Sequence, residues 1–210
     1  MIILQVCFIV FLYASFGIVH TLFATLHFKG IIASKWISLM PYYRLTYNVI
    51  SVIQFYFVYE LTPSIDIHLY DLKPPYDIII LVPQFFSLMG ILWTLRYFDA
   101  MEFIGISQIF RQRAGNYNSS QLDEESTLII KGPYKMCRHP LYFFCILFLL
   151  FRPYMFLDYL LSFICITAYF YIGSVYEENK MVERFGEKYK EYQLEVPRII
   201  PIRKSYLLFH

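Results

Sequence analysis

The sequence predicts an all-α integral membrane protein, a helical bundle with five transmembrane helices. Composition is the first reason: of 210 residues, 58% are hydrophobic and only 16% are charged, whereas soluble domains have about 25% charged residues. Tyr and Phe supply most of the 20% aromatic content, and aromatic rings gather at membrane interfaces. The apolar residues also form long runs, and a bilayer-spanning helix needs about 20 residues. We expect one membrane domain over residues 1–210.

Three apolar runs occupy the first half of the chain. Residues 2–26 are almost uncharged and lack the basic start and cleavage site of a signal peptide. The second span is expected at 45–61 and the third at 77–98, where Gln84 is one of few polar interruptions. A Pro-rich loop at 62–76 separates these two spans.

The second half predicts a helical hairpin. A hydrophilic segment at 99–139 precedes an apolar run that continues to residue 176 and is broken at Arg152 and Pro153. This run is too long for one span, so we expect antiparallel helices at 140–152 and 156–176.

The tail after residue 176 predicts an amphipathic cytoplasmic helix. Met181, Phe185, Tyr189 and Tyr192 recur at helical spacing on one face. Such a helix either anchors on the membrane surface or lies across the cytoplasmic mouth of the protein.

Lys and Arg residues predict the orientation, because cytoplasmic loops are enriched in them. The loop 27–44, the segment 99–139 and the tail are basic, whereas the loop 62–76 holds only Lys73. Five crossings with the N-terminus outside and the C-terminus cytoplasmic satisfy this pattern. The sequence leaves open whether the membrane is the plasma membrane or an endomembrane.

Residues 131–142, KGPYKMCRHPLY, form the most informative stretch. Pro140 suits the first turn of a helix, because it presets φ and its missing N–H would have no partner there. Arg138 and His139 come directly before this helix start, which suits an anionic ligand. The alternative is a positive stop at the membrane surface without chemistry.

Glu177 and Glu178 stand at the inner end of the fifth predicted span. The hairpin brings both of its ends to one membrane face, so these glutamates should lie near Arg138 and His139. They form either an interfacial ion pair or a pocket with a cation and an anion on opposite walls. Such a pocket suits a zwitterionic ligand.

Other functions have less support. The net charge of +2 is too small to indicate nucleic acid. The four cysteines show no CxxC pair and no metal-ligand spacing, so no metal site is expected. Cys137 lies beside Arg138, and we expect it to be structural rather than nucleophilic.

Four motifs in order resemble the integral-membrane S-adenosylmethionine-dependent methyltransferases. They are GPYKMCRHPLY, the EE pair, FGEKYKEY and VPRIIP. This superfamily includes isoprenylcysteine carboxyl, phospholipid and methanethiol S-methyltransferases, and nurim shares its core. HTLFATLHFK, YYRLTYNVIS and YFDAMEFIGISQ are similar to the methanethiol branch.

The resemblance implies a cytoplasmic S-adenosyl-L-methionine site within residues 126–201. His139 would bind the carboxylate of the cofactor and Glu177 its amino group, with Arg138 and His139 also candidates for catalysis. The matching cofactor residues are Thr127, Leu128, Ile129, Tyr134, His139, Pro140, Leu141, Tyr142 and Glu177.

Two departures from the family pattern bear on function. Prenylcysteine enzymes have an Arg at the position of Gly173, and its absence speaks against a carboxylate acceptor. Phe144 replaces a frequent Gly, so it either narrows the pocket or marks a chain without cofactor binding.

The sequence therefore predicts an enzyme that moves a methyl group from S-adenosylmethionine to a small or lipophilic acceptor. We expect the acceptor to be a methanethiol-like thiol, and we expect the protein to be in contact with membrane lipid. The alternatives are a protein-S-isoprenylcysteine or lipid methyltransferase and a non-catalytic, nurim-like membrane protein. The oligomeric state is left open.

Overall fold

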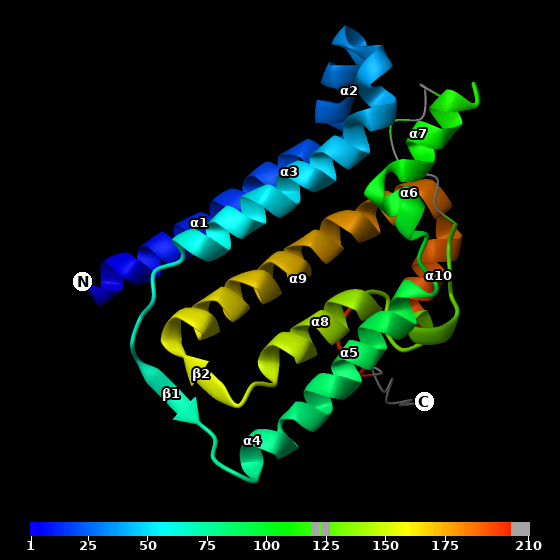
Figure 1. The fold of residues 1–210 in the computed structure, drawn as a ribbon. Coiled ribbons are helices and arrows are strands. Elements are labelled where there is room, and N and C mark those ends of the chain that lie inside the picture. The colour runs from blue at the N-terminus through cyan, green and yellow to red at the C-terminus, as the bar shows by residue number, and fades with distance from the viewer. Residues whose placement is uncertain (119–121, 123–126, 203–210) are drawn as a thin grey trace, which may run out of the picture. The chain divides into compact units, whose positions relative to one another are not determined.

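The computed structural model describes residues 1–118, Leu122 and 127–202 (Figure 1). It is mostly helical and divides into two compact units, each of which is described by itself. The first unit contains Met1–Asp66 and Asp99–Ser126, and the second contains Ile67–Phe98 and Thr127–His210. Every predicted site residue belongs to the second unit. Ser126, the first residue of the expected cofactor core, lies outside the described residues.

The first unit is built on a pair of long helices. His20 on the first helix joins Tyr47 and Ser51 on the third, with its Nε2 2.6 Å from the Tyr47 hydroxyl and its Nδ1 2.9 Å from Ser51 Oγ. Two short helices in the hydrophilic segment pack beside them, and Asn48 donates to the carbonyl of Phe103 at 2.9 Å. The elements are α1 (Ile2–Ala24), α2 (Leu26–Lys35), η1 (Ile37–Leu39), α3 (Met40–Leu61), α6 (Ala100–Ile104) and α7 (Ile106–Arg113).

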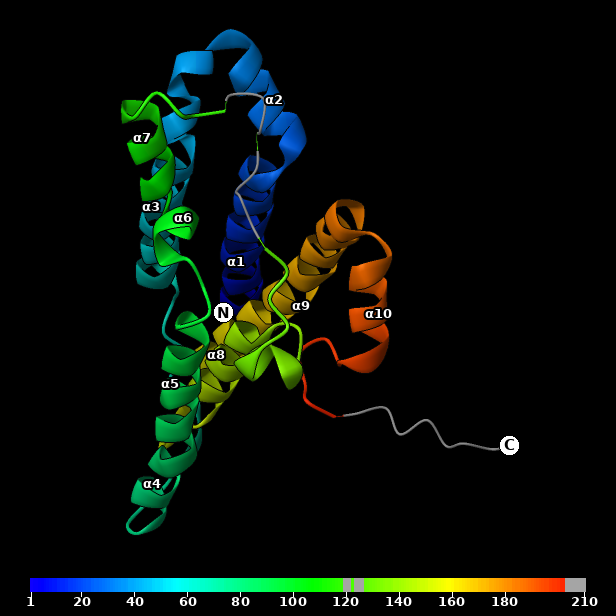
Figure 2. The ribbon, with the colours of Figure 1, turned by 90° about the vertical axis from the view of Figure 1, so that its right-hand side faces the viewer.

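The second unit contains the predicted hairpin. Helices α8 and α9 run antiparallel, and α5 packs along α8 (Figures 1 and 2). The elements are β1 (His68–Asp71), α4 (Tyr76–Ile79), α5 (Leu81–Leu95), η2 (Gly132–Lys135), α8 (Pro140–Leu150), β2 (Tyr154–Phe156), α9 (Leu157–Phe185) and α10 (Glu187–Glu195).

Three helical stretches among the described residues are long and apolar enough to cross a membrane. They are Ile2–Ala24, Tyr76–Leu95 and Leu157–Phe185. A membrane protein is therefore indicated, while five spans and their orientation stay predictions. Helix α8 has only 11 residues, and at about 1.5 Å per residue it is too short to cross the hydrocarbon core alone. Helix α3 carries Arg44, Asn48 and Gln54 among its 22 residues, which lower its hydropathy.

A short strand pair adds to the all-α architecture that the sequence predicts. β1, from the Pro-rich loop 62–76, pairs antiparallel with β2, from the turn of the hairpin. Leu72 N–H also donates to the carbonyl of Pro153 at 2.8 Å. This pairing joins segments more than 80 residues apart, so no local pattern could predict it.

The last long helix differs from the sequence prediction. A span at 156–176 followed by a separate tail helix was expected, but α9 continues without a break to Phe185. No residue between 177 and 185 is a Gly or Pro, and the first helix breaker is Gly186, which has φ of 58°. Glu177 and Glu178 therefore lie within a helix rather than at its end.

Helix α10 folds back within the second unit. Tyr189 and Tyr192 are each 4% exposed, and Tyr192 donates from its hydroxyl to the carbonyl of Tyr134. These contacts favour the interpretation of the tail as a cover over the RHP motif, rather than as a surface anchor alone. Met181 and Phe185, predicted on the same face, belong to α9 instead.

The side chain of Phe144 fills a gap in the α5–α8 interface. A Cβ placed at Gly90 would lie 2.3 Å from Phe144 Cδ1, so the ring occupies the space that Gly90 leaves. Tyr142 points elsewhere and stacks on Phe170 of α9, with ring centroids 4.6 Å apart. Residues two apart on a helix point about 200° apart, which is why Phe144 and Tyr142 face different partners.

Candidate active site

The RHP motif is held by the returning tail of the chain. Pro140 is the first residue of α8 and is buried. The backbone N–H groups of Arg138 and His139 donate to the carbonyls of Pro197 and Arg198, both at 2.9 Å. The VPR sequence of the tail thus pairs with the RH of the motif, and two of the four motifs meet through their backbones.

Glu178 is the buried centre of the cluster. Its side chain is 2% exposed, and it accepts hydrogen bonds from Arg138 Nε at 2.7 Å and Arg138 Nη2 at 3.0 Å. Gln193 Nε2 donates to it at 2.9 Å, and Arg198 Nη2 lies 3.2 Å away. A buried carboxylate is tolerated only with such compensation, so Glu178 joins α9, α10 and the tail.

Arg138 directs all its observed contacts into this cluster. Its side chain is 7% exposed, and Nη1 donates to the carbonyls of Gln193 and Val196. This placement favours a positioning role for Arg138 over direct contact with a substrate.

His139 lies between the two glutamates. Its Nε2 is 3.2 Å from Glu178 Oε1, and its Nδ1 is 3.3 Å from Glu177 Oε2. Burial alone would lower the pKa of His139, but hydrogen bonds and charge from Glu177 and Glu178 outweigh it and raise the pKa. A larger fraction of the His139 side chain is therefore protonated at neutral pH than for an ordinary histidine.

Glu177 is the exposed anion of the site. Its side chain is 50% exposed, against 2% for its neighbour Glu178. The hydroxyl of Tyr142 donates to Glu177. The Tyr142 ring lies between His139, with centroids 5.3 Å apart, and Phe170, and both pairs are nearly parallel. An accessible carboxylate therefore lies beside a stack of three aromatic rings.

The other predicted cofactor residues lie around this cluster to different degrees. Tyr134 is in η2, and burial followed by the charge of Glu177 raises the pKa of its hydroxyl, which places it within electrostatic range of that carboxylate. Leu141 is half-buried in the first turn of α8. Thr127, Leu128 and Ile129 precede η2 and belong to no helix or strand, and among the described residues no hydrogen bond joins them to the His139 cluster.

Three residues of the cluster were not predicted from the sequence: Phe170, Gln193 and Arg198. Phe170 stacks on Tyr142, while the carbonyls of Gln193 and Arg198 accept from Arg138 Nη1 and from the backbone N–H of His139. Glu178 was expected near Arg138 and His139, but not among the cofactor residues. The VPR motif was the available signal for Arg198, whereas Gln193 and Phe170 carry no local signal.

Cys137 is fully buried and lies in the sequence between Pro133 of η2 and Pro140, the first residue of α8. Burial raises the pKa of its thiol to about 12. A thiol in this state is a poor nucleophile at neutral pH, which agrees with the structural role expected from the sequence.

Curated relatives support the resemblance seen in the motifs. Over 202 residues the chain is 25% identical to methanethiol S-methyltransferase 1 of Bradyrhizobium diazoefficiens, covering 92% of this chain and 66% of that protein. It is also 25% identical to the methanethiol S-methyltransferase of Pseudomonas deceptionensis, covering 91% of this chain and 71% of that protein. The chain resembles methanethiol S-methyltransferases. A relative of the same name from another Pseudomonas strain is 28% identical over 199 residues.

These matches confirm the predicted resemblance, and they extend over both units of the chain. The chain spans 66% of the length of the Bradyrhizobium protein, just under two thirds. No family profile and no solved structure matches the chain.

Proposed function

We propose that this chain is an integral-membrane methyltransferase that transfers a methyl group from S-adenosylmethionine to a small thiol. The proposal depends on one observation above all. Glu177 presents a half-exposed carboxylate 3.3 Å from His139, whose pKa is raised by the two glutamates, in a chain that matches methanethiol S-methyltransferases over nine tenths of its length. The buried Glu178 holds this pair in place, because it follows Glu177 on α9 and contacts Nε2 of His139.

The residues present fit the ammonium of the methyl donor. Its amino-acid end carries an ammonium and a carboxylate, and Glu177 suits the ammonium because its side chain is 50% exposed. Tyr142 at Oε1 and His139 at Oε2 orient the carboxylate, and each oxygen can accept a further hydrogen bond. His139 would bind the donor carboxylate in exchange for Glu177 at its Nδ1, since Glu178 holds its Nε2. S-adenosylmethionine supplies an electrophilic methyl group on a sulfonium when bound.

The chain's own residues would contribute mainly alignment and exclusion of water. The rings of His139, Tyr142 and Phe170 are aligned, because Tyr142 stacks on each of the other two. Helix α10 covers the motif through Tyr189 and Tyr192. The acceptor thiol loses its proton to solvent, and the resulting thiolate attacks the methyl carbon while the bond from that carbon to the sulfonium breaks. Because a thiolate is strongly nucleophilic, holding it near the methyl group is the main requirement placed on the chain.

Gly173 affects which acceptor substrate suits the proposed site. It lies one helical turn before Glu177 on α9, and a Cβ added there meets nothing within 4 Å. The face of α9 that carries Phe170 and Glu177 is therefore open at this position and has no cation at it. A neutral or thiolate acceptor suits such a surface better than a carboxylate.

Replacing Glu177 by Gln is expected to weaken S-adenosylmethionine binding about tenfold or more, while the protein still folds. The change removes the charge that the donor ammonium would meet, and a hydrogen bond to a charged group contributes about 1.5–3 kcal/mol. Binding can be measured by isothermal titration calorimetry on the full chain in detergent.

Glu183→Gln is the matched control, because Glu183 is an exposed glutamate on the same helix and should leave binding unchanged. Wild-type protein that binds no donor at millimolar concentration would refute the enzyme proposal and favour a scaffold.

We expect the wild-type protein to methylate methanethiol faster than a farnesylcysteine analogue when both are offered at equal concentration. The reason is the missing cation at Gly173. Transfer of a radiolabelled methyl group from the donor gives both rates in one reaction. Gly173→Arg should shift the ratio toward farnesylcysteine, while Gly173→Ala, which adds no charge, should not. Faster labelling of the farnesylcysteine analogue by the wild type would show that the proposed thiol acceptor is wrong.

A further inference from the structure

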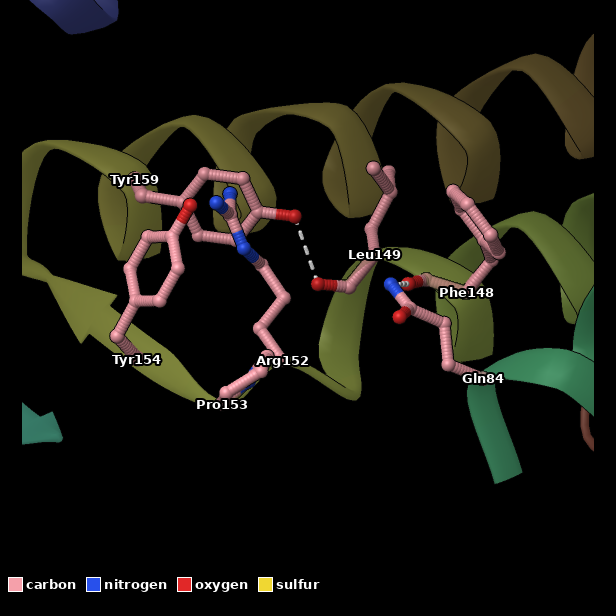
Figure 3. Close-up of a pocket in the computed structure, with 7 residues that line it drawn as sticks. All are labelled: Gln84, Phe148, Leu149, Arg152, Pro153, Tyr154 and Tyr159. Carbon is pink, nitrogen blue, oxygen red and sulfur yellow. Dashed lines mark hydrogen bonds between the residues drawn. The ribbon is translucent and has the colours of Figure 1, made fainter. Parts of the chain in front are cut away.

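A second site lies at the other end of the α8–α9 hairpin, away from His139 and Glu177. A pocket of about 350 Å³ opens where α5, the end of α8 and the start of α9 meet (Figure 3). It contains none of the residues of the candidate active site. Its lining includes Gln84, Phe148, Leu149, Arg152, Tyr154 and Tyr159.

Arg152 is the charged group of this pocket. Its guanidinium carbon lies 3.9 Å from the ring centre of Tyr159 and 4.7 Å from that of Tyr154. Within residues 1–118, 122 and 127–202, no Asp or Glu forms an ion pair with it. The two rings hold the guanidinium in place through cation–π contacts but leave its charge without a counterion.

The carbonyls near Arg152 are occupied by other donors. Gln84 Nε2 donates to the carbonyl of Phe148 at 3.1 Å, and the Tyr159 hydroxyl donates to that of Leu149 at 2.7 Å (Figure 3). These are carbonyls of the last turn of α8, which would otherwise need a cap. Because Gln84 and Tyr159 satisfy them, capping by Arg152 does not account for its position.

The side chains that line the pocket indicate the chemical class of its ligand. A planar guanidinium binds phosphate oxygens through two parallel N–H donors, and Phe148 and Leu149 supply an apolar wall beside it. The pocket also lies at the end of a strongly apolar helix, where α8 gives way to the turn. A phospholipid combines a phosphate in its headgroup with apolar acyl chains, so it matches both parts of this lining.

We propose that this pocket binds the phosphodiester group of a membrane phospholipid through Arg152, whose guanidinium the rings of Tyr154 and Tyr159 hold in place. The site is independent of the proposed methyl transfer, since it shares no residue with it. A bound lipid would join α5 to the hairpin through contacts to both.

The test is a native mass-spectrometry titration of the full chain, purified in detergent, with dihexanoylphosphatidylglycerol. Arg152→Gln should weaken lipid binding about tenfold or more, because it removes the charge but keeps polar N–H groups. Lys73→Gln is the matched control. Lys73 is a basic residue on the adjoining loop, with a side chain 76% exposed and paired with Asp71, and its replacement should change binding by no more than about twofold.

A second variant and a second ligand make the result decisive. Arg152→Lys keeps the charge but loses the planar fork, and we expect binding between those of the wild type and Arg152→Gln. It also serves if Arg152→Gln does not elute as a single folded species. Lipid binding by Arg152→Gln equal to that of the wild type would overturn the proposal. Inorganic phosphate binding as tightly as the lipid, and lost in the same variants, would overturn the lipid as ligand in favour of a free anion.

Discussion

Replacing Glu178 by Ala is expected to destabilise the protein by about 3–5 kcal/mol, the cost of leaving a buried charge without its partner. Arg138 is the charge at stake, since it is 7% exposed and donates to both oxygens of Glu178. Arg198 and Gln193 lose an acceptor at the same time. The contacts between α9, α10 and the tail should therefore loosen together.

Unfolding in mixed micelles of detergent and sodium dodecyl sulfate measures this effect, with Glu177→Ala as control. Glu177 is the preceding residue but is 50% exposed, and exposed ion pairs contribute about 0–1 kcal/mol. The two variants should therefore separate clearly. Equal losses of stability in both would contradict the assignment of Glu178 as the centre of the cluster.

The contrast between Glu177 and Glu178 shows where sequence reasoning stopped. The hairpin was predictable because it follows from the length of an apolar run and a break at Arg152 and Pro153. The proximity of the EE pair to the RHP motif followed from the same hairpin. Which glutamate turns inward was not predictable, because adjacent residues on a helix differ by about 100° and the inward side is set by where α10 and the tail return.

Two helix ends were not predicted, although a local residue marks each of them. Thr25 was not recognised as the cap that separates α1 from α2, although its side chain accepts from the backbone N–H of Phe28. Gly186 ends α9, but the polar character of residues 177–185 was read as the start of a separate helix. Polarity marks where a helix leaves an apolar environment, not where its hydrogen bonding ends.

The position of Phe144 bears on the two interpretations of that residue. The sequence left open whether its ring narrows the cofactor pocket or marks a chain without cofactor. In the structure the ring lies against α5, in the space left by Gly90, while Tyr142 faces α9 and Glu177. A bulky residue at this position is thus accommodated by helix packing, away from the aromatic stack.

Gly90→Ala is therefore expected to destabilise the protein by about 1–3 kcal/mol, the usual cost of overpacking a close contact. The added methyl group would lie 2.3 Å from Cδ1 of Phe144, a rigid ring atom. In a Phe144→Ala background the further cost of Gly90→Ala should be much smaller, because the atoms that clash are absent. A double-mutant cycle on unfolding free energies gives the coupling directly.

Gly173→Ala is the matched control for this cycle, since it changes another helical glycine whose added Cβ meets nothing within 4 Å. It should leave stability unchanged or raise it by up to about 1 kcal/mol, because Ala favours helix more than Gly does. If Gly90→Ala is as benign as Gly173→Ala, the Phe144 ring is not fixed against α5. The interpretation in which the Phe144 ring narrows the cofactor pocket would then stay open.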